Sequence, residues 1–243
     1  MTELLYRLDP YGRDAGATVV SSGPEGVVLD RTLFYARAGG QPGDSGTLRW
    51  AKPDGSYAEA KVAEALKGLD NTVLHTVPED APRPEPGTHV VASIDWERRH
   101  RHMRMHTTLH LLCAVMPGIY ATGNQIGAEK SRLDFDLPEP PPKEWLTMQL
   151  NALIAADHPV EERWIEEAEL DRNPGLVRTL SVQPPRGAGQ IRLVRIGSEE
   201  SPVDLQPCGG THVRSTREIG AVEVTKLESK GKQNRRVHIV LKD

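Results

Sequence analysis

Short apolar runs separated by glycine, proline and aspartate dominate the first 95 residues. Runs rich in valine, isoleucine and threonine that end at such turn residues are typical of β-strands. The clearest runs cover residues 17–20, 26–29, 72–77 and 89–94. Because no long helical pattern interrupts them, residues 1–95 are predicted to form a small β-barrel domain.

The pattern changes after Asp95, which can cap a helix that runs from Trp96 to about residue 115 and ends before Pro117 and Gly118. A second helix is predicted over residues 143–156, a short acidic helix over 166–171 and a loop over 121–127. Strands are predicted at residues 133–136, 160–165, 191–196, 221–224 and 237–241. Residues 96–243 therefore form an expected α+β domain, with helices packed on one face of a mainly antiparallel sheet.

Composition limits the class of protein. The chain has 243 residues, enough for two small domains with their own cores, and a formal net charge of -4. With only Cys113 and Cys208, no signal-like start and no bilayer-length apolar run, we expect a reducing cytoplasm, no membrane partner and no nucleotide cofactor. The negative charge disfavours indiscriminate nucleic-acid binding, but residues 98–104 and 226–236 are locally basic.

Two pairs of side chains suggest a metal site. His106 and His110 stand four residues apart in the predicted helix, so both face the same side. Cys208 and His212 flank Gly-Gly-Thr, where the chain can curl so that thiolate and imidazole point at one ion. Three imidazoles and one thiolate suit zinc, and we expect one Zn²⁺ per chain.

Two nearby side chains are excluded as ligands. Cys113 lies two helical turns from His106, a rise of roughly 10 Å that metal–ligand bonds of about 2 Å cannot bridge, so it is predicted to be a core residue. His102 lies in a basic run and is predicted to be solvated or to face phosphate. For Arg98, Arg99 and Arg101 the sequence leaves a solvated face and an RNA contact open.

The spacing alone does not decide between a structural and a catalytic metal. Thr107 stands where zincin proteases carry a catalytic glutamate, so that class is excluded. Four protein ligands describe a closed, structural site. The hydroxyls of Thr107, Thr108 and Thr211 and the amide of Gln125 could instead orient a small polar substrate and a water. A general esterase is disfavoured because no Gly-x-Ser-x-Gly turn is present.

A glycine-rich segment follows Phe34 and Tyr35, with four glycines in residues 39–46. Composition favours a flexible loop over a close approach of backbone to a ligand or another domain. Together with the His106/His110 and Cys208/His212 motifs and the basic residues 229–236, however, this segment resembles the AlaX alanyl-tRNA editing proteins. These are freestanding relatives of the editing domain of alanyl-tRNA synthetase. The absence of a long helical extension after residue 243 matches the medium-length type, and the glycine-rich motif favours this family over the threonyl-tRNA synthetase editing domain.

The resemblance implies a trans-editing deacylase that hydrolyses serine, and as a second substrate glycine, from mischarged tRNA(Ala). It implies zinc ligands at His106, His110, Cys208 and His212, and a role for Gln125 in amino-acid discrimination and water placement, beside Thr107 and Thr108. The expected substrate pocket comprises Gly39, Gly40, Gln41, Asp44, Gly46 and Thr211. The acceptor end of the tRNA is expected at Lys230, Lys232, Arg235 and Arg236. The alternatives are a tRNA-binding module with a purely structural zinc, and an editor of another mischarged tRNA.

Overall fold

A computed structural model describes residues 1–180 and 189–242. Contacts within the chain divide it into two compact units, Met1–His100 and Arg101–Asp243, which we call unit 1 and unit 2. Each unit is described by itself. No helix in the described part of the chain is long and apolar enough to cross a membrane.

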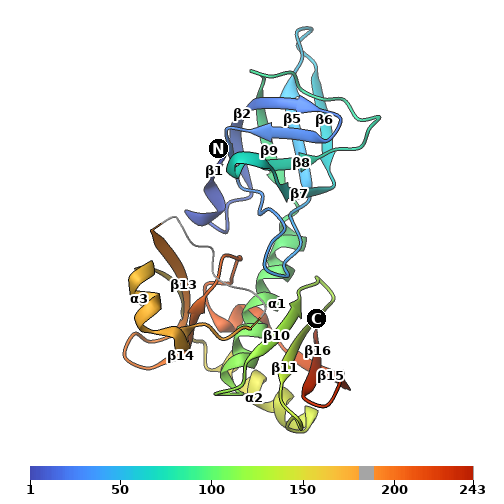
Figure 1. Ribbon diagram of the computed structural model, residues 1–243. Coiled ribbons are helices and arrows are strands. Elements are labelled where there is room, and N and C mark those ends of the chain that lie inside the picture. Colours follow the sequence, from blue (N-terminus) through green and yellow to red (C-terminus); the bar gives the residue numbers. More distant parts are fainter. Residues whose placement is uncertain (181–188, 243) are drawn as a thin grey trace. The chain divides into compact units, whose positions relative to one another are not determined.

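Unit 1 is built from antiparallel strands (Figure 1). Its seven-stranded sheet has the order β6-β5-β9-β2-β3-β8-β7, and β1 and β4 form a separate, short parallel pair. The bounds are β1 (Glu3–Leu4), β2 (Asp14–Gly23), β3 (Gly26–Leu29), β4 (Arg31–Thr32), β5 (Gly46–Ala51), β6 (Tyr57–Val62), β7 (Glu64–Lys67), β8 (Val73–Thr76) and β9 (His89–Ile94), with 3-10 turns at Leu5–Arg7 and Leu69–Asn71.

The predicted closed barrel is not confirmed. Within unit 1, which is described throughout, no ladder joins the two ends of the strand order, β6 and β7. These strands follow one another with only Ala63 between them, too short a link for the chain to reverse and pair with itself. Instead β6 pairs with β5 and β7 with β8, while β2 pairs with β9 along its first half and with β3 along its second. The predicted strands are present, but the sequence pattern missed β1, β4, β5, β6 and β7.

Alternation places one face of these strands in a core. Each strand sends every second side chain to the same side, and the buried members from four strands are Val19, Val27, Leu29, Leu48, Val90 and Ala92, joined by Phe34. Such burial contributes about 1.5–3 kcal/mol for each large aliphatic side chain. Unit 1 thus has a core of its own, as a domain requires.

The glycine-rich segment forms a defined turn. Ala38 and Gln41 exchange two backbone hydrogen bonds of 3.1 and 2.9 Å around Gly39 and Gly40, whose φ angles are +58° and +84°. Positive φ at both central positions is the geometry of a type I′ turn, which glycine adopts without steric cost. At Gly46 in β5, a Cβ atom would overlap the carbonyl oxygen of Ser93. The glycines here are explained by backbone geometry.

A buried ion pair fixes the end of this segment. The side chains of Arg99 and Asp44 are 0% and 1% exposed, and Nε of Arg99 lies 2.9 Å from Oδ1 of Asp44. Asp44 also accepts a 2.6 Å bond from the Tyr35 amide, and Arg99 donates to the Leu33 carbonyl at 2.6 Å. With both charges paired and hydrogen-bonded, burial is tolerated. Arg99 therefore lies on neither a solvated face nor an RNA-binding face.

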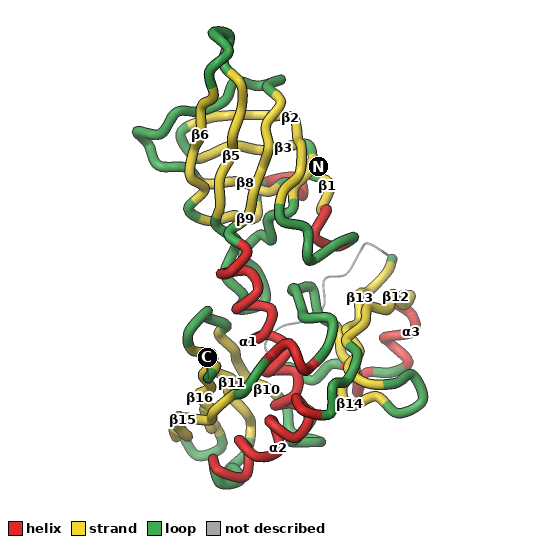
Figure 2. Tube along the Cα trace, turned by 180° about the vertical axis from the view of Figure 1, so that it is seen from behind, coloured by secondary structure: helices red, strands yellow, loops and turns green. Residues whose placement is uncertain are grey.

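Unit 2 contains two antiparallel sheets, β10-β11-β16-β15 and β12-β13-β14, where a single sheet was predicted (Figure 2). Its elements are α1 (Trp96–Ala114, in unit 2 from Arg101 onward), β10 (Ala121–Gln125), β11 (Lys130–Asp136), α2 (Lys143–Ala155), β12 (Val160–Glu166), α3 (Glu167–Arg172), β13 (Gln190–Gly197), β14 (Pro202–Pro207), β15 (Val222–Ser229) and β16 (Asn234–Leu241), with 3-10 turns at Pro174–Leu176 and Thr216–Ile219. The helices lie within one or two residues of their predicted bounds.

Local signals explain the successes and the omissions. Asp95 caps α1 as predicted, since its Oδ1 accepts a 3.1 Å bond from the amide of Arg98. The predicted loop at residues 121–127 contains β10, whose polar sequence has no apolar alternation and which is a strand because β11 pairs with it. The sequence also missed β14, an edge strand that pairs with β13. Pairing partners far away in the sequence decide such strands.

One buried histidine of unit 1, His75, is expected to make the stability of the fold depend on pH. His75 is fully buried, with Nδ1 3.0 Å from the carbonyl oxygen of Val27 and Nε2 2.8 Å from Oγ1 of Thr32. Nδ1–H donates to the carbonyl, so Nε2 accepts from the hydroxyl and the ring is neutral. Burial lowers the pKa of His75 to about 4.

Replacing His75 by glutamine should flatten the dependence of stability on pH. The unfolded chain binds a proton at this histidine near pH 6.5 and the folded chain only near pH 4, so wild-type stability falls as the pH drops through that window. We expect this histidine to contribute about 1.4 kcal/mol per pH unit inside the window. Urea unfolding of both proteins between pH 7 and pH 4 measures it; equal slopes would contradict the assignment.

Candidate metal centre

The structure brings the four predicted ligands of unit 2 together. Their ligand atoms all lie within 4.8 Å of one another, and the cluster could hold a metal ion. Helix α1 supplies His106 and His110, which are one turn apart, and the loop after β14 supplies Cys208 and His212. Sγ of Cys208 lies 3.4 Å from Nε2 of His106 and 3.3 Å from Nε2 of His212. The three imidazoles are buried and the thiol is partly exposed.

The pKa shifts of Cys208 and His212 favour the forms of these side chains that bind a cation. Burial alone would raise the pKa of the Cys208 thiol, but the neighbouring imidazoles of His106 and His212 outweigh it and lower that pKa well below 9. Burial and the charge of His106 lower the pKa of His212 well below 6.5. Thiolate and neutral imidazole are the forms that bind metal.

Asp204 on β14 orients His110. Its Oδ2 lies 2.9 Å from Nδ1 of His110 and accepts a second bond, of 2.8 Å, from Nε2 of Gln206. A carboxylate on Nδ1 holds the proton there and leaves Nε2 for a metal. Burial alone would lower the pKa of His110, but Asp204 and Cys208 outweigh it and raise that pKa to about 10, so a bound metal would have to displace a proton at Nε2.

Asp204 was missed by the sequence analysis. It stands in a six-residue edge strand without a motif of its own. The signal that could have found it is an acidic residue alternating with Gln206 just before the Cys208 motif.

Thr107 holds the ring of His212 in the same way. Its hydroxyl donates to the Met103 carbonyl at 2.9 Å and therefore accepts from Nδ1–H of His212 at 3.1 Å. Nε2 of His212 is then the free donor atom and points to the thiolate of Cys208. The hydroxyl of Thr107, predicted to be catalytic, is thus committed to orienting a ligand.

Arg192 on β13 fixes the loop that carries Cys208. Its Nη1 donates to the carbonyl oxygens of Cys208 and Gly210 at 2.6 and 3.0 Å, and its Nη2 donates to Oε1 of Glu162 on β12 at 2.6 Å. The guanidinium fork suits several acceptors held at fixed angles. The backbone on both sides of Gly209 is thereby held by a strand whose contact with the motif no local pattern predicts.

The other predicted pocket hydroxyls and the amide have different positions. Thr108 is fully buried and donates to the Arg104 carbonyl one turn earlier at 2.8 Å, and Thr211 is also buried, beside His212 in the loop. Gln125 lies at the exposed end of β10, where its Oε1 accepts a 3.2 Å bond from Nε of Arg132. Their roles in catalysis or in a pocket remain predictions.

The two excluded side chains differ in outcome. Cys113 is buried as predicted, and burial raises the pKa of its thiol to about 12, so it is inert. His102 lies outside the cluster of possible ligands among the described residues, but it is 2% exposed and the prediction of a solvated side chain was wrong. The run of charges around it does not face solvent uniformly, since α1 is enclosed on several sides: Arg101 donates to the Ala128 carbonyl and Arg104 to that of Ile219.

The five predicted pocket residues of the glycine-rich segment lie in unit 1. They are Gly39, Gly40, Gln41, Asp44 and Gly46, of which Gln41 and Asp44 are buried. The turn at Gly39 and Gly40 and the ion pair of Asp44 explain the backbone conformation of this segment. A role beside a substrate stays a prediction.

The predicted tRNA-binding residues lie on the hairpin of β15 and β16. Arg236 makes two 2.8 Å bonds to the carboxylate of Asp134, which raises the pKa of the guanidinium, and its side chain is largely covered. Arg235 donates to the Gly231 carbonyl at 2.6 Å, while Lys230 lies 3.4 Å from Glu228 and Lys232 is exposed. The hairpin therefore exposes fewer uncompensated cations than the sequence suggests.

Comparison with known proteins first defines a class. The family described as "Threonyl and Alanyl tRNA synthetase second additional domain" matches residues 191–238, and "tRNA synthetases class II (A)" matches residues 12–98. The first match contains Asp204, Cys208 and His212. The Cys208 and His212 half of the cluster thus lies in a domain type shared with aminoacyl-tRNA synthetases, and His106 and His110 lie outside both matches.

Full-length relatives define the family within that class. The chain is 34% identical to "Alanyl-tRNA editing protein AlaX-M" of Methanosarcina acetivorans over the whole of both proteins, and 38% identical to the protein of that name from Methanosarcina mazei over all of this chain and 98% of the relative. It belongs to the AlaX-M family of alanyl-tRNA editing proteins, as the resemblance predicted. It is also 39% identical to "Alanine--tRNA ligase" of Pyrobaculum arsenaticum, where 93% of this chain matches 25% of the ligase.

Removing the carboxylate of Asp204 should weaken metal binding without unfolding the protein. We expect Asp204→Ala to lower the affinity for Zn²⁺ by about 10- to 100-fold, because Nδ1 of His110 loses the acceptor that fixes its tautomer. Asp204→Asn, which keeps an acceptor oxygen, should lose less. Competition with a chromophoric chelator measures the affinity, and Asp136→Asn, at an exposed strand end, is the control. Unchanged affinity in Asp204→Ala would refute the orienting role.

Proposed function

We propose that this protein is a zinc-dependent aminoacyl-tRNA deacylase that acts in trans on tRNA(Ala) mischarged with serine and, as a second substrate, glycine. Full-length relatives named as alanyl-tRNA editing proteins support the editing reaction. The observation that carries the metal dependence is the cluster of His106, His110, Cys208 and His212, with a thiolate and oriented imidazoles. In this proposal residues 1–95 form a domain with the glycine-rich motif, and residues 96–243 form the editing domain.

Zinc is the metal that this donor set fits best. One thiolate and three imidazole nitrogens match its preference for soft and borderline ligands in tetrahedral geometry. When bound, zinc supplies a Lewis acid that polarises an ester carbonyl or lowers the pKa of a water. Around it, Asp204 and Thr107 hold the rings of His110 and His212, and Arg192 holds the loop, so the donors are pre-arranged before substrate arrives.

The proposed substrates follow from a limit on selectivity in aminoacylation. Serine differs from alanine by one hydroxyl and glycine by one methyl, and differences of that size give only modest discrimination in a single pocket. A second site that hydrogen-bonds the serine hydroxyl spares alanine, which would leave the polar groups of the site unpaired. We assign this recognition to Thr108, Thr211 and Gln125.

A tRNA-binding module with a structural metal is the second candidate. The observation in its favour is that the cluster offers four protein ligand atoms, the number that closes the coordination of a structural zinc. In that case the metal would stabilise the fold and the protein would bind tRNA without hydrolysing it.

Deacylation of three charged tRNAs tests the proposal. We expect the wild-type protein to release serine and glycine from tRNA(Ala) and to leave alanine attached, and Cys208→Ala to reduce both activities to the uncatalysed rate because the thiolate that anchors the metal is lost. Release of free amino acid over time is the measurement.

Chelation separates the two candidate functions. Loss of hydrolysis with the far-ultraviolet circular dichroism and tRNA binding retained, and recovery when Zn²⁺ is restored, supports the deacylase. Unfolding on chelation, or tRNA binding without hydrolysis of any charged tRNA, supports the structural metal instead.

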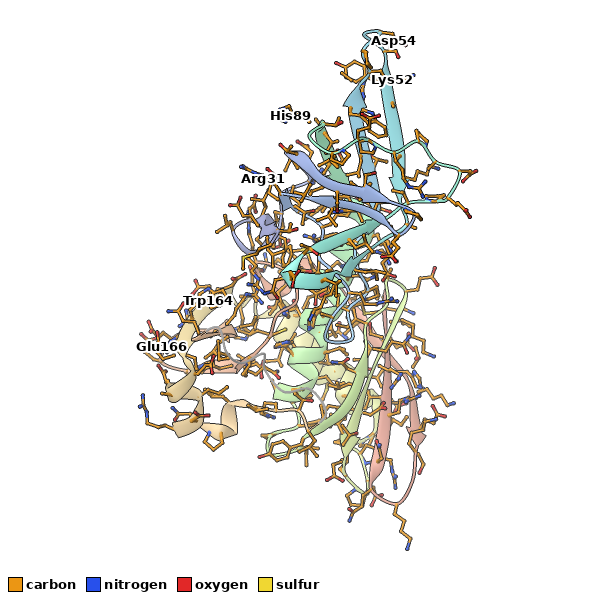
Figure 3. The ribbon with its side chains drawn as sticks, turned by 45° about the horizontal axis from the view of Figure 1, so that its top comes forward. Arg31, Lys52, Asp54, His89, Trp164 and Glu166 are labelled. Carbon is orange, nitrogen blue, oxygen red and sulfur yellow. The ribbon has the colours of Figure 1, made fainter. Side chains whose placement is uncertain are left out.

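The β15–β16 hairpin is the proposed contact with the acceptor end of the tRNA. Lys230 and Lys232 flank the turn at Gly231, and we expect the double variant Lys230→Ala/Lys232→Ala to bind tRNA more weakly and with a salt dependence reduced by about 1 to 2 in the logarithmic slope. Lys52→Ala, an exposed lysine of unit 1, is the control (Figure 3). Binding isotherms at several salt concentrations measure the slope, and an unchanged slope would remove the hairpin from the interface. Arg235 and Arg236 belong to the same proposed contact, with Arg236 partly neutralised by Asp134.

A further inference from the structure

One face of the β12-β13-β14 sheet carries the support of the metal centre. Alternate residues of β14, Asp204 and Gln206, are buried on this face; Asp204 accepts from His110, and Gln206 donates to Asp204. In register with Gln206 is Val194 of β13, and two residues before Val194 is Arg192, which holds the Cys208 loop. Side chains two residues apart on a strand share a face. This face of the sheet therefore extends from β14, beside His110, across β13 to β12.

Trp164 continues this face beyond its buried part. It pairs directly with Arg192 in the antiparallel ladder, so both side chains stand on the same side of the sheet. Whereas Val194, Asp204 and Gln206 are buried, Trp164 is 45% exposed. Figure 3 shows Trp164 and Glu166 at the outer margin of unit 2. A large aromatic ring therefore lies on the face that supports the metal centre, where solvent reaches it.

The backbone spacing between Trp164 and Cys208 suits one nucleoside. Trp164 pairs with Arg192, and the amide of Cys208 donates to the Arg192 carbonyl at 3.2 Å, so Trp164 and Cys208 are two strand spacings apart. At about 4.8 Å per spacing this is about 10 Å between backbones. A nucleoside whose ribose ester lies at the metal centre would extend its base over a comparable length.

The charges beside Trp164 favour a base over a phosphate. The neighbours on the same face of β12 are Glu162, which binds Arg192, and Glu166, which accepts a 3.2 Å bond from Nε2 of Gln190. Carboxylates repel phosphate but accept hydrogen bonds from the amino groups of a base or from ribose hydroxyls. Stacking of a base on an aromatic ring, in contrast, needs no net charge.

We infer that Trp164 is a stacking platform for the unpaired 3′-terminal nucleoside of the RNA, which holds the ester of that nucleoside at the metal centre. The inference rests on the proposed function for the identity of the RNA. It adds a binding site on β12 that acts on the base, separate from the phosphate contacts proposed for the β15–β16 hairpin.

Binding of two uncharged RNAs tests the platform directly. One is an acceptor-stem minihelix that ends in unpaired CCA, and the other is the same minihelix without its terminal adenosine. We expect Trp164→Ala to bind the CCA minihelix about 5- to 100-fold more weakly than the wild type, the effect of losing one base-stacking contact, and to bind the shortened minihelix as the wild type does. Trp164→Phe, which keeps an aromatic face, should lose much less.

Matched controls separate stacking from damage to the fold. Trp145→Ala removes another partly exposed tryptophan, 38% exposed on α2, and should leave both affinities unchanged. The zinc content of Trp164→Ala should equal that of the wild type. Because stacking involves no counterion release, Trp164→Ala should also keep the wild-type salt slope.

Kinetics give a second measurement on charged tRNA. If stacking holds the substrate equally in the ground and transition states, Trp164→Ala raises KM by a similar factor and leaves kcat near the wild-type value. Equal weakening of both minihelices, or no weakening of either, would overturn the platform. A wild-type protein that hydrolyses no charged tRNA would refute the proposed function, while the comparison of the two minihelices would still decide the role of Trp164.

Discussion

The association of one partly exposed thiolate with three buried imidazoles is the interaction on which unit 2 depends. Each imidazole that turns Nε2 towards the thiolate must place its other nitrogen on a partner, because an unpaired polar group in the interior is costly. Asp204 supplies that partner for His110 and Thr107 supplies it for His212. The strand β14 and the interior of α1 are therefore constrained by the tautomers that the centre needs.

Unit 1 follows the same rule with different chemistry. The ion pair of Arg99 and Asp44 is buried together with the backbone groups that complete its hydrogen bonds, and His75 is held neutral between Thr32 and the Val27 carbonyl. These polar contacts join segments that are far apart in the sequence. The ion pair fixes the glycine-rich segment at its Asp44 end, while the type I′ turn fixes it at Gly39 and Gly40.

The two sheets of unit 2 have different roles in the proposed function. The β10-β11-β16-β15 sheet bears cations near the turn at Gly231, although Asp134 neutralises one of them. The β12-β13-β14 sheet bears the support of the metal centre on the face where Trp164 is exposed. An editing enzyme needs both a grip on the RNA backbone and a fixed position for the terminal ester, and the two require different side chains.

The sequence by itself determined the helices, most of the long strands and the four residues of the cluster that could hold a metal. These features are local properties of the sequence: helix periodicity, the Asp95 cap and the spacing of His106 and His110. Cys208 and His212 also lie within five residues of each other, so their motif is visible in the sequence alone. Only the tertiary structure decided the rest: that β10 and β14 are strands, that the sheet of unit 1 is not closed by a ladder, that Arg99 and His102 are buried, that Asp204 and Arg192 contact the cluster and its loop, and that Trp164 is exposed on the same face. These features arise from pairing and burial between distant segments, which no local pattern of residues encodes.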